Sequence, residues 1–518
     1  MRSLQEHLDA PALGDPPIDA ARQPGGEAIV DGCAGGSCGV LANYWLDVDS
    51  DGVIVECTAR VRGRASAFAT ASALCEAAAG RSVVDAARLG ISTLHPSFAA
   101  LDEEDMERAL VAEDGFHHAL GRWLLARMHD APTGTGAARP ELPPAIPERD
   151  RPVAIVGMSG GVDSAVAIHR MAEEHDGRAL GATLRLWIDP RAPDPEAACC
   201  SPDSVRRARA TCHAAGLPHL SIDLRQEFAR DVVVPFVTGY AQGETPNPCV
   251  SCNGRFRLDE LVRLADVVGA REVATGHYAR IVERGGAALI QRGVDHTKDQ
   301  SYMLAEVEPR TAARLRFPLG EQHKTEIRVE AADRGLEQAT TPESQEVCFL
   351  GGGDYRQFLK RAGAMGMPGE IVMGGAVVGT HDGIARFTPG QRKGIGVAAP
   401  HPLYVLDVDP ATGRVQVGPD GAPQLEEIAL GDLRWHDPTT PPSHVTAQLR
   451  YRSRGGMPRA QVRTTGLEEG VDAVLVLDAP ERTPAPGQAA VLYDDDDVVV
   501  GTARILRRAP LVGARPAG

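Results

Sequence analysis

The fold is decided by the segment RPVAIVGMSGGVDSAVAIHRMAEEH, residues 151–175. An apolar run leads through a glycine-rich turn into a helical pattern, which predicts a buried strand followed directly by a helix. The glycines let the backbone approach a phosphate, and the N–H groups at the helix start attract an anion. We therefore expect a pyrophosphate site without a lysine in the loop, with Asp163 as a ligand of Mg²⁺. An ordinary glycine-rich turn is the alternative.

The residues on either side extend this unit into a larger sheet. ALGATLRLWI (179–188) and REVATGHYA (271–279) are further apolar runs, and SPDSVRRARATCHAAG (201–216) has an N-cap residue and helical spacing. Strands that alternate with helices indicate a parallel α/β sheet. Beyond about residue 365 the pattern changes to short β-like runs separated by Gly, Pro and Asp, which predicts two small β domains divided near residue 430.

A stretch rich in Pro, Gly and Ala, residues 131–150, is typical of an interdomain linker. Before it, the alternating runs LANYWLDVD and VIVECTARVRG meet at the turn DSDG and predict a hairpin. Alanine-rich helical stretches follow the hairpin, so this part is predicted to be an α+β domain. We expect residues 1–25 to be a disordered lead-in. The expected domains then cover residues 26–130, 151–364, 365–429 and 430–518.

The chain has 518 residues, enough for roughly two to four domains. Its formal net charge is −16, and residues 1–150 contribute −11 of it, with 12 Lys and Arg against 23 Asp and Glu. A polyanionic partner therefore finds a basic patch more easily beyond residue 150. Ten cysteines are too few for a secreted disulfide scaffold, and we find no signal peptide and no membrane-spanning apolar run. We expect a soluble, cytoplasmic protein.

Thiols in two segments are the candidate reactive or metal-binding groups. TPNPCVSCN (245–253) contains Cys249 and Cys252, and ESQEVCFLG (343–351) contains Cys348. Three thiolates can bind one metal ion or iron–sulfur cluster and leave one position open. Taken alone, Cys348 is better explained as a buried small apolar residue. The Cys-x-x-Cys pair has a structural alternative as half of a zinc site, but no second Cys-x-x-Cys or His pair completes it.

Two further patterns have structural explanations. Cys199 and Cys200 precede a helix that the sequence SPDS caps, and we expect these two cysteines to be structural. Asp494–Asp497 separate two β-like runs, which favours a solvated hairpin turn over a metal site.

Several motifs, in the same order along the chain, resemble those of the tRNA-specific 2-thiouridylase family, known as MnmA. The resemblance implies a PP-loop ATP pyrophosphatase domain (adenine nucleotide alpha hydrolase-like), a small central β-rich domain and a C-terminal β-barrel. It also implies ATP-dependent 2-thiolation of the wobble uridine of tRNA, with adenylation of the C2 oxygen before sulfur transfer. The motifs, spread over residues 151–510, are GMSGGVDS, TPNPCVSCN, ATGHYAR, DHTKDQSYML, PLG, SQEVCFL, FTPGQRKGIG, LRYR and PGQAAVLY.

The resemblance assigns roles to individual positions. Cys252 and Cys348 match the two cysteines that handle sulfur, and Cys249 and Asp163 join them in the catalytic set. Many members have Asp where this chain has Cys249, so a [4Fe-4S] cluster on Cys249, Cys252 and Cys348 is an alternative to a persulfide. ATP binding is assigned to Gly157, Met158, Ser159, Gly160, Gly161, Val162, Asp163, Ser164, Leu184 and Gly276. Contacts with tRNA are assigned to Thr245, Pro246, Asn247, His277, Lys298, Asp299, Gln300, Arg450, Tyr451 and Gln488.

Residues 26–130 resemble, more weakly, the iron–sulfur scaffold family of IscU and NifU. Cys38 matches the first scaffold cysteine and His117 the histidine of that family. The second cysteine position falls on Arg64, and the third falls on or beside His118. The position of the acidic ligand falls on Val40. Because most thiolates are missing, docking of a partner is favoured over cluster assembly, unless Cys33, Cys57 and Cys75 converge and substitute for them.

The expected reaction uses ATP with Mg²⁺, tRNA, and a cysteine desulfurase or another sulfur donor. Sulfur reaches C2 either from a persulfide on Cys348, resolved by Cys252, or from sulfide on the open iron of a cluster. Two other classes stay open: another PP-loop enzyme, such as an amidotransferase-type synthetase, and a non-catalytic iron–sulfur scaffold or sulfur carrier. The first does not explain three cysteines together with a barrel, and the second does not need an intact loop.

Overall fold

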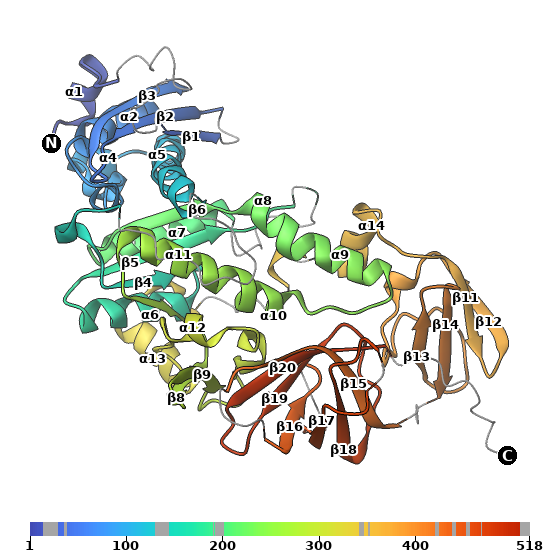
Figure 1. Ribbon diagram of the computed structural model, residues 1–518. Coiled ribbons are helices and arrows are strands. Elements are labelled where there is room, and N and C mark those ends of the chain that lie inside the picture. Colours follow the sequence, from blue (N-terminus) through green and yellow to red (C-terminus); the bar gives the residue numbers. More distant parts are fainter. Residues whose placement is uncertain are drawn as a thin grey trace.

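The computed structural model describes residues 1–13, 30–35, 39–129, 145–189, 191, 201–340, 347–350, 353–419, 424–437, 442–451, 456–467 and 469–507. They form an α+β domain, an α/β domain, a small β domain and a β-barrel, in that order along the chain (Figure 1). This confirms the predicted multidomain fold class. Over these ranges, no helix has both the length and the apolar character that a membrane crossing requires.

The α/β domain is built on a five-stranded parallel sheet with the order β10-β7-β4-β5-β6. Ile155 and Val156 belong to different core clusters, because successive residues of a strand face opposite sides and both faces of the sheet are covered. The strands are β4 (Ala154–Gly157), β5 (Ala179–Arg185), β6 (His219–Asp223), β7 (Glu272–Thr275) and β10 (Leu315–Arg316). The main helices are α6 (Val162–Glu174), α7 (Pro202–Ala214), α11 (Leu258–Val268) and α13 (Lys324–Asp333).

Shorter elements connect these strands and helices. Two of them, η4 and η5, are π-helical turns, a rare geometry that is often found at functional sites. The connecting elements are η2 (Glu148–Asp150), α8 (Arg225–Phe228), η4 (Ala229–Val233), α9 (Val234–Ala241), α10 (Pro248–Cys252), η5 (Asn253–Arg257), the hairpin of β8 (Ala279–Arg284) and β9 (Ala287–Arg292), η6 (Ser301–Leu304), α12 (Pro309–Ala312), η7 (Glu337–Thr340), η8 (Cys348–Leu350) and α14 (Tyr355–Arg361).

The N-terminal domain packs helices against a three-stranded antiparallel sheet with the order β1-β2-β3. The predicted hairpin is confirmed, with Leu41 paired to Arg62. Tyr44, Phe116 and Trp123 are fully buried between the sheet and the long helix α5. The elements are α1 (Leu4–Asp9), β1 (Val30–Gly35), β2 (Leu41–Val48), β3 (Ile54–Arg62), α2 (Ala65–Ala78), α3 (Val83–Ala86), η1 (Ile91–Thr93), α4 (Pro96–Ala99) and α5 (Glu103–His129).

The disordered lead-in expected over residues 1–25 is wrong for its first part, where α1 forms. Ser3 and Glu6 make a capping box, which satisfies free N–H groups at the start of this short helix. His7 is buried, and its Nδ1 lies 2.9 Å from Ser72 Oγ. Tertiary contacts with α2 therefore fix a helix that sequence composition alone does not suggest. Residues 14–29 lie outside the described part of the chain.

The N-terminal domain packs directly on the α/β domain, along the edge strand β6 (Figure 1). Gly121 of α5 comes so close to β6 that a Cβ atom there would lie 2.0 Å from the Ser221 carbonyl oxygen. His219 N–H donates to the Ala87 carbonyl oxygen over 3.1 Å. The helix therefore covers a strand edge that would otherwise be open to other chains. Of the expected linker, residues 131–144 lie outside the described residues, whereas Ile146 is buried.

Two β domains follow the α/β domain. The central sheet has the order β12-β11-β14-β13, and the last six strands close into a barrel with the order β15-β18-β17-β16-β19-β20. The division expected near residue 430 falls inside β15. The central strands are β11 (Gly369–Met373), β12 (Ala376–His381), β13 (Leu403–Asp409) and β14 (Arg414–Pro419), with the turn η9 (Ile384–Arg386). The barrel strands are β15 (Gln424–Trp435), β16 (His444–Gln448), β17 (Arg459–Arg463), β18 (Ala473–Arg482), β19 (Ala489–Tyr493) and β20 (Val499–Ile505).

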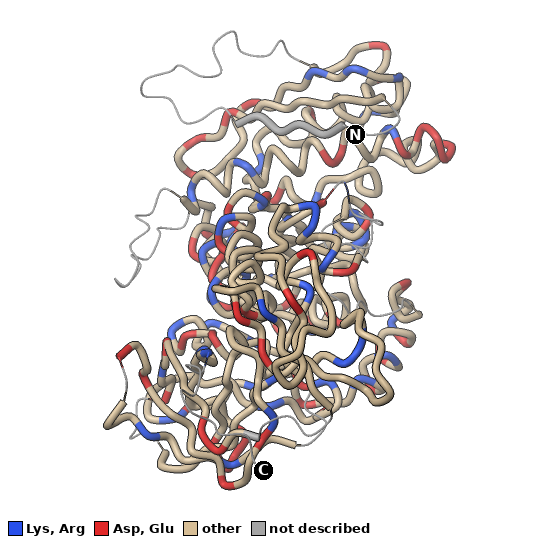
Figure 2. Tube along the Cα trace, turned by 90° about the vertical axis from the view of Figure 1, so that its right-hand side faces the viewer, with Lys and Arg blue, Asp and Glu red and all other residues tan. Residues whose placement is uncertain are grey.

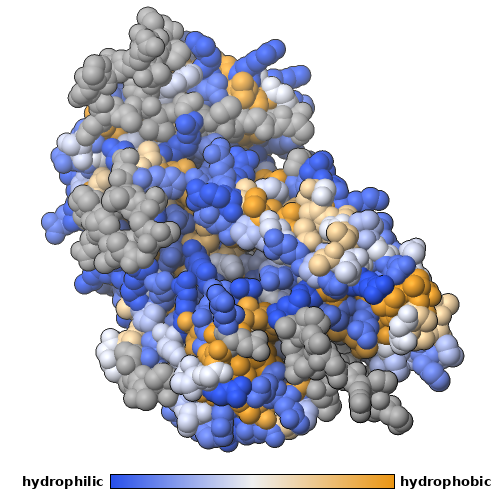
Figure 3. All heavy atoms as spheres, turned by 45° about the vertical axis from the view of Figure 1, so that its right-hand side comes forward, coloured by the Kyte–Doolittle hydropathy of each residue, from blue (hydrophilic) through white to orange (hydrophobic). Residues whose placement is uncertain are grey.

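The surface of these domains is mixed in character. Lys and Arg are interspersed with Asp and Glu over the coloured part of the tube (Figure 2). Apolar atoms reach the surface over the outer strands of the central domain (Figure 3), where Met373 and Val377 are exposed.

The turn between β19 and β20 contains Asp494–Asp497 and joins the barrel to the hairpin β8–β9. Arg284 of β8 forms ion pairs with Asp494 and, over 3.2 Å, with Asp496. Arg292 N–H donates to the Asp497 carbonyl oxygen over 3.1 Å. The predicted hairpin turn is present, but Asp494 is largely buried in a domain contact rather than solvated.

Candidate functional site

The glycine-rich loop joins β4 to α6, as the sequence predicts. Gly160 has a φ of +75°, and a Cβ atom there would lie 2.5 Å from the Ser204 carbonyl oxygen, so glycine is required. Ser164 Oγ donates to the Gly161 carbonyl oxygen over 2.9 Å and accepts from Ser159 N–H over 3.2 Å. The loop is closed on itself at the N-terminus of α6, where backbone N–H groups can bind an anion.

The other residues predicted to bind ATP lie in this loop or at the same edge of the sheet. Gly276 follows β7 and approaches the loop so closely that a Cβ atom would lie 2.8 Å from the backbone carbonyl carbon of Asp163. Leu184 is two residues beyond Ala182, which pairs with Gly157 in the sheet. This is the carboxyl edge of a parallel sheet, where ligands of α/β proteins bind.

The side chain of Asp163 is engaged within the chain. Its Oδ1 and Oδ2 atoms each lie 2.7 Å from Lys324 Nζ, and the Tyr278 hydroxyl donates to Oδ1 over 2.8 Å. Sequence reasoning missed Lys324, which is 161 residues away along the chain. The only signal in the sequence is a lysine at the start of the helical stretch 324–333.

The predicted sulfur-handling cysteines lie on two short helical segments. Cys249 and Cys252 are on α10, whose N-cap residue Asn247 accepts from Cys249 N–H through its side chain over 3.1 Å. Cys348 begins η8. Cys252 is buried, whereas Cys249 and Cys348 are half-buried. A half-buried thiol can be reached by a reacting group while most of its surroundings exclude water.

One cluster of aromatic rings anchors both cysteine-bearing segments. The Phe349 ring, next to Cys348, lies 5.2 Å from that of Phe236 and 6.0 Å from that of Phe228, measured between centroids. Phe228 in turn lies 5.7 Å from Phe256 in η5, the π-helical turn that follows Cys252. Such edge-to-face contacts stabilise each pair by about 0.5–1.5 kcal/mol beyond burial. The cluster therefore fixes the relative position of η8 and α10.

The described residues do not provide a metal site. Among them, no group of three or more His, Cys, Asp and Glu side chains could hold a metal ion. Cys249, Cys252 and Cys348 do not form such a group in the arrangement of this structure. In the N-terminal domain, Cys57 and Cys75 have their Sγ atoms 3.2 Å apart in the core, and burial raises the pKa of the Cys75 thiol.

The other scaffold-like positions that the structure describes in the N-terminal domain are not arranged as ligands either. Arg64 is exposed and Val40 is buried. His117 Nε2 donates to the Leu89 carbonyl oxygen over 2.9 Å, and burial, with Arg209 nearby, lowers the pKa of His117 well below its usual value. His118 Nε2 lies 4.0 Å from Asp223 Oδ2 of the α/β domain. Cys38, Cys199, Cys200 and the side chain of Cys33 lie outside the described residues.

The loop that precedes Cys249 is held where three domains meet. Thr245 N–H donates to the Pro486 carbonyl oxygen over 2.8 Å, and the Gln488 side-chain amide donates to the Thr245 carbonyl oxygen. Thr245 Oγ1 donates to Thr388 Oγ1 of the central domain over 3.4 Å. Gln488, predicted to contact tRNA, thus has its amide bound to this loop, and the barrel helps to position α10.

Residues predicted to contact tRNA in the segment 277–300 also make internal contacts. Gln300 Oε1 accepts from Tyr278 N–H over 2.9 Å, and Asp299 Oδ1 accepts from Gly293 N–H over 3.0 Å. Burial, with a smaller contribution from Arg257, lowers the pKa of His277 to about 4. His277 is therefore neutral at pH 7. Lys298 is half-buried, as are Pro246 and Asn247.

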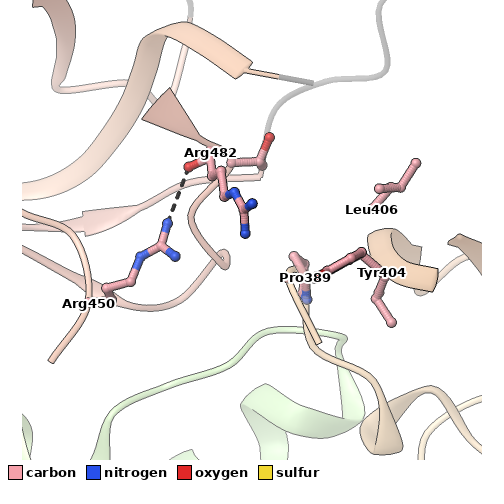
Figure 4. Close-up of a pocket in the computed structure, with 8 residues that line it drawn as sticks. Pro389, Tyr404, Leu406, Arg450 and Arg482 are labelled. Atoms are coloured by element: carbon pink, nitrogen blue, oxygen red, sulfur yellow. Dashed lines mark hydrogen bonds between the residues drawn. The ribbon is translucent and has the colours of Figure 1, made fainter. Parts of the chain in front are cut away.

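Arg450 lines a pocket between the central domain and the barrel. Figure 4 shows Arg450 and Arg482 on the barrel side, across from Pro389 and Tyr404. Arg450 Nη2 donates to the Arg482 carbonyl oxygen over 3.3 Å. Beside the pocket, the exposed Tyr451 ring lies 6.1 Å from that of Tyr302. Guanidinium groups beside an aromatic ring suit a phosphate and an unstacked base.

Comparisons with known proteins agree with this division of the chain. Sequence models of three domain families match: a tRNA methyl transferase HUP domain over residues 153–352, a tRNA methyl transferase PRC-barrel domain over 356–419, and an aminomethyltransferase beta-barrel domain over 425–505.

Curated relatives match over nearly their whole length. A tRNA-specific 2-thiouridylase MnmA of Sorangium cellulosum is 41% identical over 373 residues, which is 71% of this chain and 94% of the relative. One from Acidithiobacillus ferrooxidans is 40% identical over 67% of this chain and 97% of its own length. A bifunctional protein NifU/MnmA of Rubrobacter xylanophilus is 38% identical over 493 residues, 94% of this chain and 96% of the relative.

Proposed function

The chain belongs to the tRNA-specific 2-thiouridylase family and carries a NifU-like N-terminal domain, and from this membership we propose roles for its individual residues. It is a tRNA sulfurtransferase that uses ATP to form 2-thiouridine. The observation that supports the roles best is a loop shaped for pyrophosphate, Gly157–Ser164, in the same domain as two cysteine segments held by one aromatic cluster.

The first step is activation of the wobble uridine. The backbone N–H groups at the start of α6 bind the phosphates of ATP, and Gly276 and Leu184 bound the nucleotide at the sheet edge. The C2 oxygen of uridine attacks the α-phosphorus, the bond to pyrophosphate breaks, and pyrophosphate leaves. The product is an adenylate whose leaving group at C2 is AMP. Mg²⁺, when bound with ATP, neutralises charge on the leaving pyrophosphate.

The second step is sulfur transfer. A persulfide on Cys348 attacks C2 through its terminal sulfur, and AMP leaves with the C2 oxygen. The Cys252 thiolate then attacks Cys348 Sγ, which breaks the sulfur–sulfur bond and leaves sulfur on C2. Cys252 and Cys348 end as a disulfide, which a low-molecular-weight thiol or a dithiol protein reduces before the next turnover. This route uses Cys348 and Cys252 alone, and delivery of sulfide by a cluster on Cys249, Cys252 and Cys348 is the alternative route.

The substrate surface runs from the loop before α10 to the junction between the central domain and the barrel. Lys298 and Arg450 are suited to phosphates, and Tyr451 to a base taken out of its stack. Thr245, Pro246, Asn247, His277, Asp299, Gln300 and Gln488 border the same region. For Asp299, Gln300 and Gln488, the internal hydrogen bonds support a role in shaping the tRNA site as well as touching it.

The NifU-like domain is proposed to receive the sulfur donor, a cysteine desulfurase or a persulfide carrier. Its position supports this role, since α5 lies against β6 of the α/β domain and keeps a bound donor beside the enzyme. Most of the thiolates that bind a cluster in the scaffold family are missing from this domain, which supports docking of a partner over cluster assembly.

The test is tRNA-dependent turnover by the full chain. ATP, Mg²⁺, unmodified tRNA, a cysteine desulfurase and cysteine are supplied, and pyrophosphate, AMP and 2-thiouridine are measured by chromatography and mass spectrometry. Cys348→Ser is expected to keep tRNA-dependent pyrophosphate release and to lose both AMP release and 2-thiouridine. Cys252→Ser is expected to release AMP for a single turnover and to lose 2-thiouridine, because the bond between Cys348 and the transferred sulfur is not broken. AMP release that does not depend on tRNA would favour another PP-loop enzyme, and a lack of ATP binding would favour a scaffold or carrier.

A further inference from the structure

Lys324 is a buried cation beside the glycine-rich loop. Its side chain is 7% exposed, and its Nζ atom lies 2.7 Å from each carboxylate oxygen of Asp163. Tyr278 donates its hydroxyl to the same carboxylate and presents its ring 5.6 Å from Nζ. A lysine is seldom buried to this extent unless its charge is paired, so this ion pair is a built part of the loop's surroundings.

The backbone of Lys324 is fixed as firmly as its side chain. Lys324 is the first residue of α13, and its N–H donates to Asp295 Oδ2 over 3.0 Å. Asp295 is buried and also accepts from Thr297 Oγ1 over 2.6 Å, which ties the start of α13 to the segment 295–300. This segment is part of the proposed tRNA surface.

Helix α13 is also locked against α6, the helix that carries Asp163. Ile327 packs with Val162 and Val166 of α6 in one buried cluster. Arg170 of α6 donates to the Pro318 carbonyl oxygen over 2.7 Å and pairs with Glu330 of α13. These contacts hold the Lys324 ammonium and the Asp163 carboxylate at a set distance.

The pairing changes what Asp163 can do. A carboxylate with no partner at the N-terminus of α6 would repel an incoming pyrophosphate, because like charges disfavour each other at short range. Both oxygens of Asp163 already contact an ammonium, and one also accepts from a hydroxyl. Asp163 is therefore placed as the partner of Lys324 rather than as an open ligand for Mg²⁺.

On the basis of the proposed function, we infer that Lys324 is a positioning residue for ATP. It neutralises and orients Asp163, so that the loop and the start of α6 meet the nucleotide with net positive potential. In this role Asp163 and Lys324 act as a unit, and the loss of lysine alone is worse than the loss of both charges.

The experiment is a double-variant cycle for ATP binding by the full chain, measured by calorimetry at fixed Mg²⁺. Lys324→Met is expected to weaken ATP binding by about 30- to 100-fold, because it leaves Asp163 with an unpaired charge near the phosphates. Adding Asp163→Asn to Lys324→Met is expected to restore at least about tenfold of that loss. Lys324→Arg, which keeps the charge, stays within about fivefold of the wild type.

Two further measurements separate this role from a merely structural one. The Mg²⁺ concentration for half-maximal ATP binding should change by less than about threefold in the double variant, whereas a direct Mg²⁺ ligand at Asp163 would make it rise steeply. Unfolding temperature and tRNA affinity report whether a variant is folded.

A double variant that is folded, yet binds ATP no better than Lys324→Met or needs far more Mg²⁺, overturns the inference. If ATP affinities across the wild type and the variants follow the expected pattern but the wild type makes no 2-thiouridine, the inference stands and the proposed function is refuted.

Discussion

Glu113 of α5 and Arg209 of α7 form a buried ion pair across the boundary between the N-terminal and α/β domains, with Oε1 and Nε 2.7 Å apart. Glu113 Oε2 also accepts from Ile91 N–H over 2.9 Å, and Arg209 pairs with Asp114 as well. A charge network of this kind has a demanding geometry, so it specifies one relative orientation of the two domains. The NifU-like domain is therefore not a module that swings freely on a linker.

The first prediction concerns this pair. Arg209→Met removes one partner and leaves Glu113 buried with its charge, which should lower the free energy of unfolding by about 3–5 kcal/mol. The matched control is Arg206→Met, because Arg206 pairs with Asp114 over 2.7 Å at a more exposed position and should cost about 1 kcal/mol or less. Urea unfolding of the full chain measures both. Equal losses in the two variants would show that the buried pair does not fix the boundary.

The second prediction concerns pH. Burial lowers the pKa values of His117, His213 and His219, whose side chains lie at or near the same boundary. As the pH falls below about 6.5, the unfolded chain takes up protons that the folded chain does not, so stability decreases toward acid. Each histidine contributes a slope of at most about 1.4 kcal/mol per pH unit.

His213→Gln should make this slope shallower, because it removes one histidine whose pKa is lowered by burial. Thermal unfolding at a series of pH values between about 5 and 7.5 provides the measurement. If stability does not change over this range, the buried histidines do not cause a loss of stability at acid pH.

The third prediction concerns Cys249. Because the proposed persulfide route uses Cys348 and Cys252 but not Cys249, Cys249→Asp should keep 2-thiouridine formation within about threefold when desulfurase and cysteine supply the sulfur. Wild-type protein purified anaerobically should contain no stoichiometric iron and no broad absorbance near about 400 nm. Iron, that absorbance and their loss in Cys249→Asp would instead establish the cluster on Cys249, Cys252 and Cys348.

The fourth prediction concerns the pocket between the central domain and the barrel. Arg450→Ala and Arg482→Ala should each weaken tRNA binding and reduce the dependence of log Kd on log salt by about one phosphate contact. Arg149→Ala is the control, because Arg149 is 73% exposed and lies in η2, ahead of the α/β sheet. Filter binding at several salt concentrations gives the slopes. If the slopes of log Kd against log salt are unchanged in the two pocket variants, tRNA does not bind at this pocket.

The sequence predicts local features of the site well. The strand, the glycine turn and the helix over residues 151–175 follow from a pattern within one short segment, and the structure confirms them. Alternating strands and helices predict the parallel sheet, and short β-like runs predict the two β domains. The family resemblance identifies the thiouridylase because its motifs extend over most of the chain.

Contacts between distant segments are what the sequence does not supply. Lys324 meets Asp163 because α13 packs on α6, and no periodicity in either segment indicates that pairing. Likewise, Asp494 sits in a run of four acidic residues that is typical of a solvated turn, yet it pairs with Arg284 more than two hundred residues away. The charge of a side chain is readable from the sequence, but its partner depends on tertiary packing.

Because α5 covers β6, the order in which the ribosome synthesises these two elements matters for folding. Synthesis proceeds at roughly 5–20 residues per second, so α5 leaves the ribosome several seconds before β6, which ends about 90 residues later. During that interval the N-terminal domain can fold around its own core, while the face of α5 that later packs on β6 is still exposed to solvent. The edge of the nascent α/β sheet then meets an already folded domain of its own chain rather than another nascent chain, so the N-terminal domain can act as a folding template for the sheet.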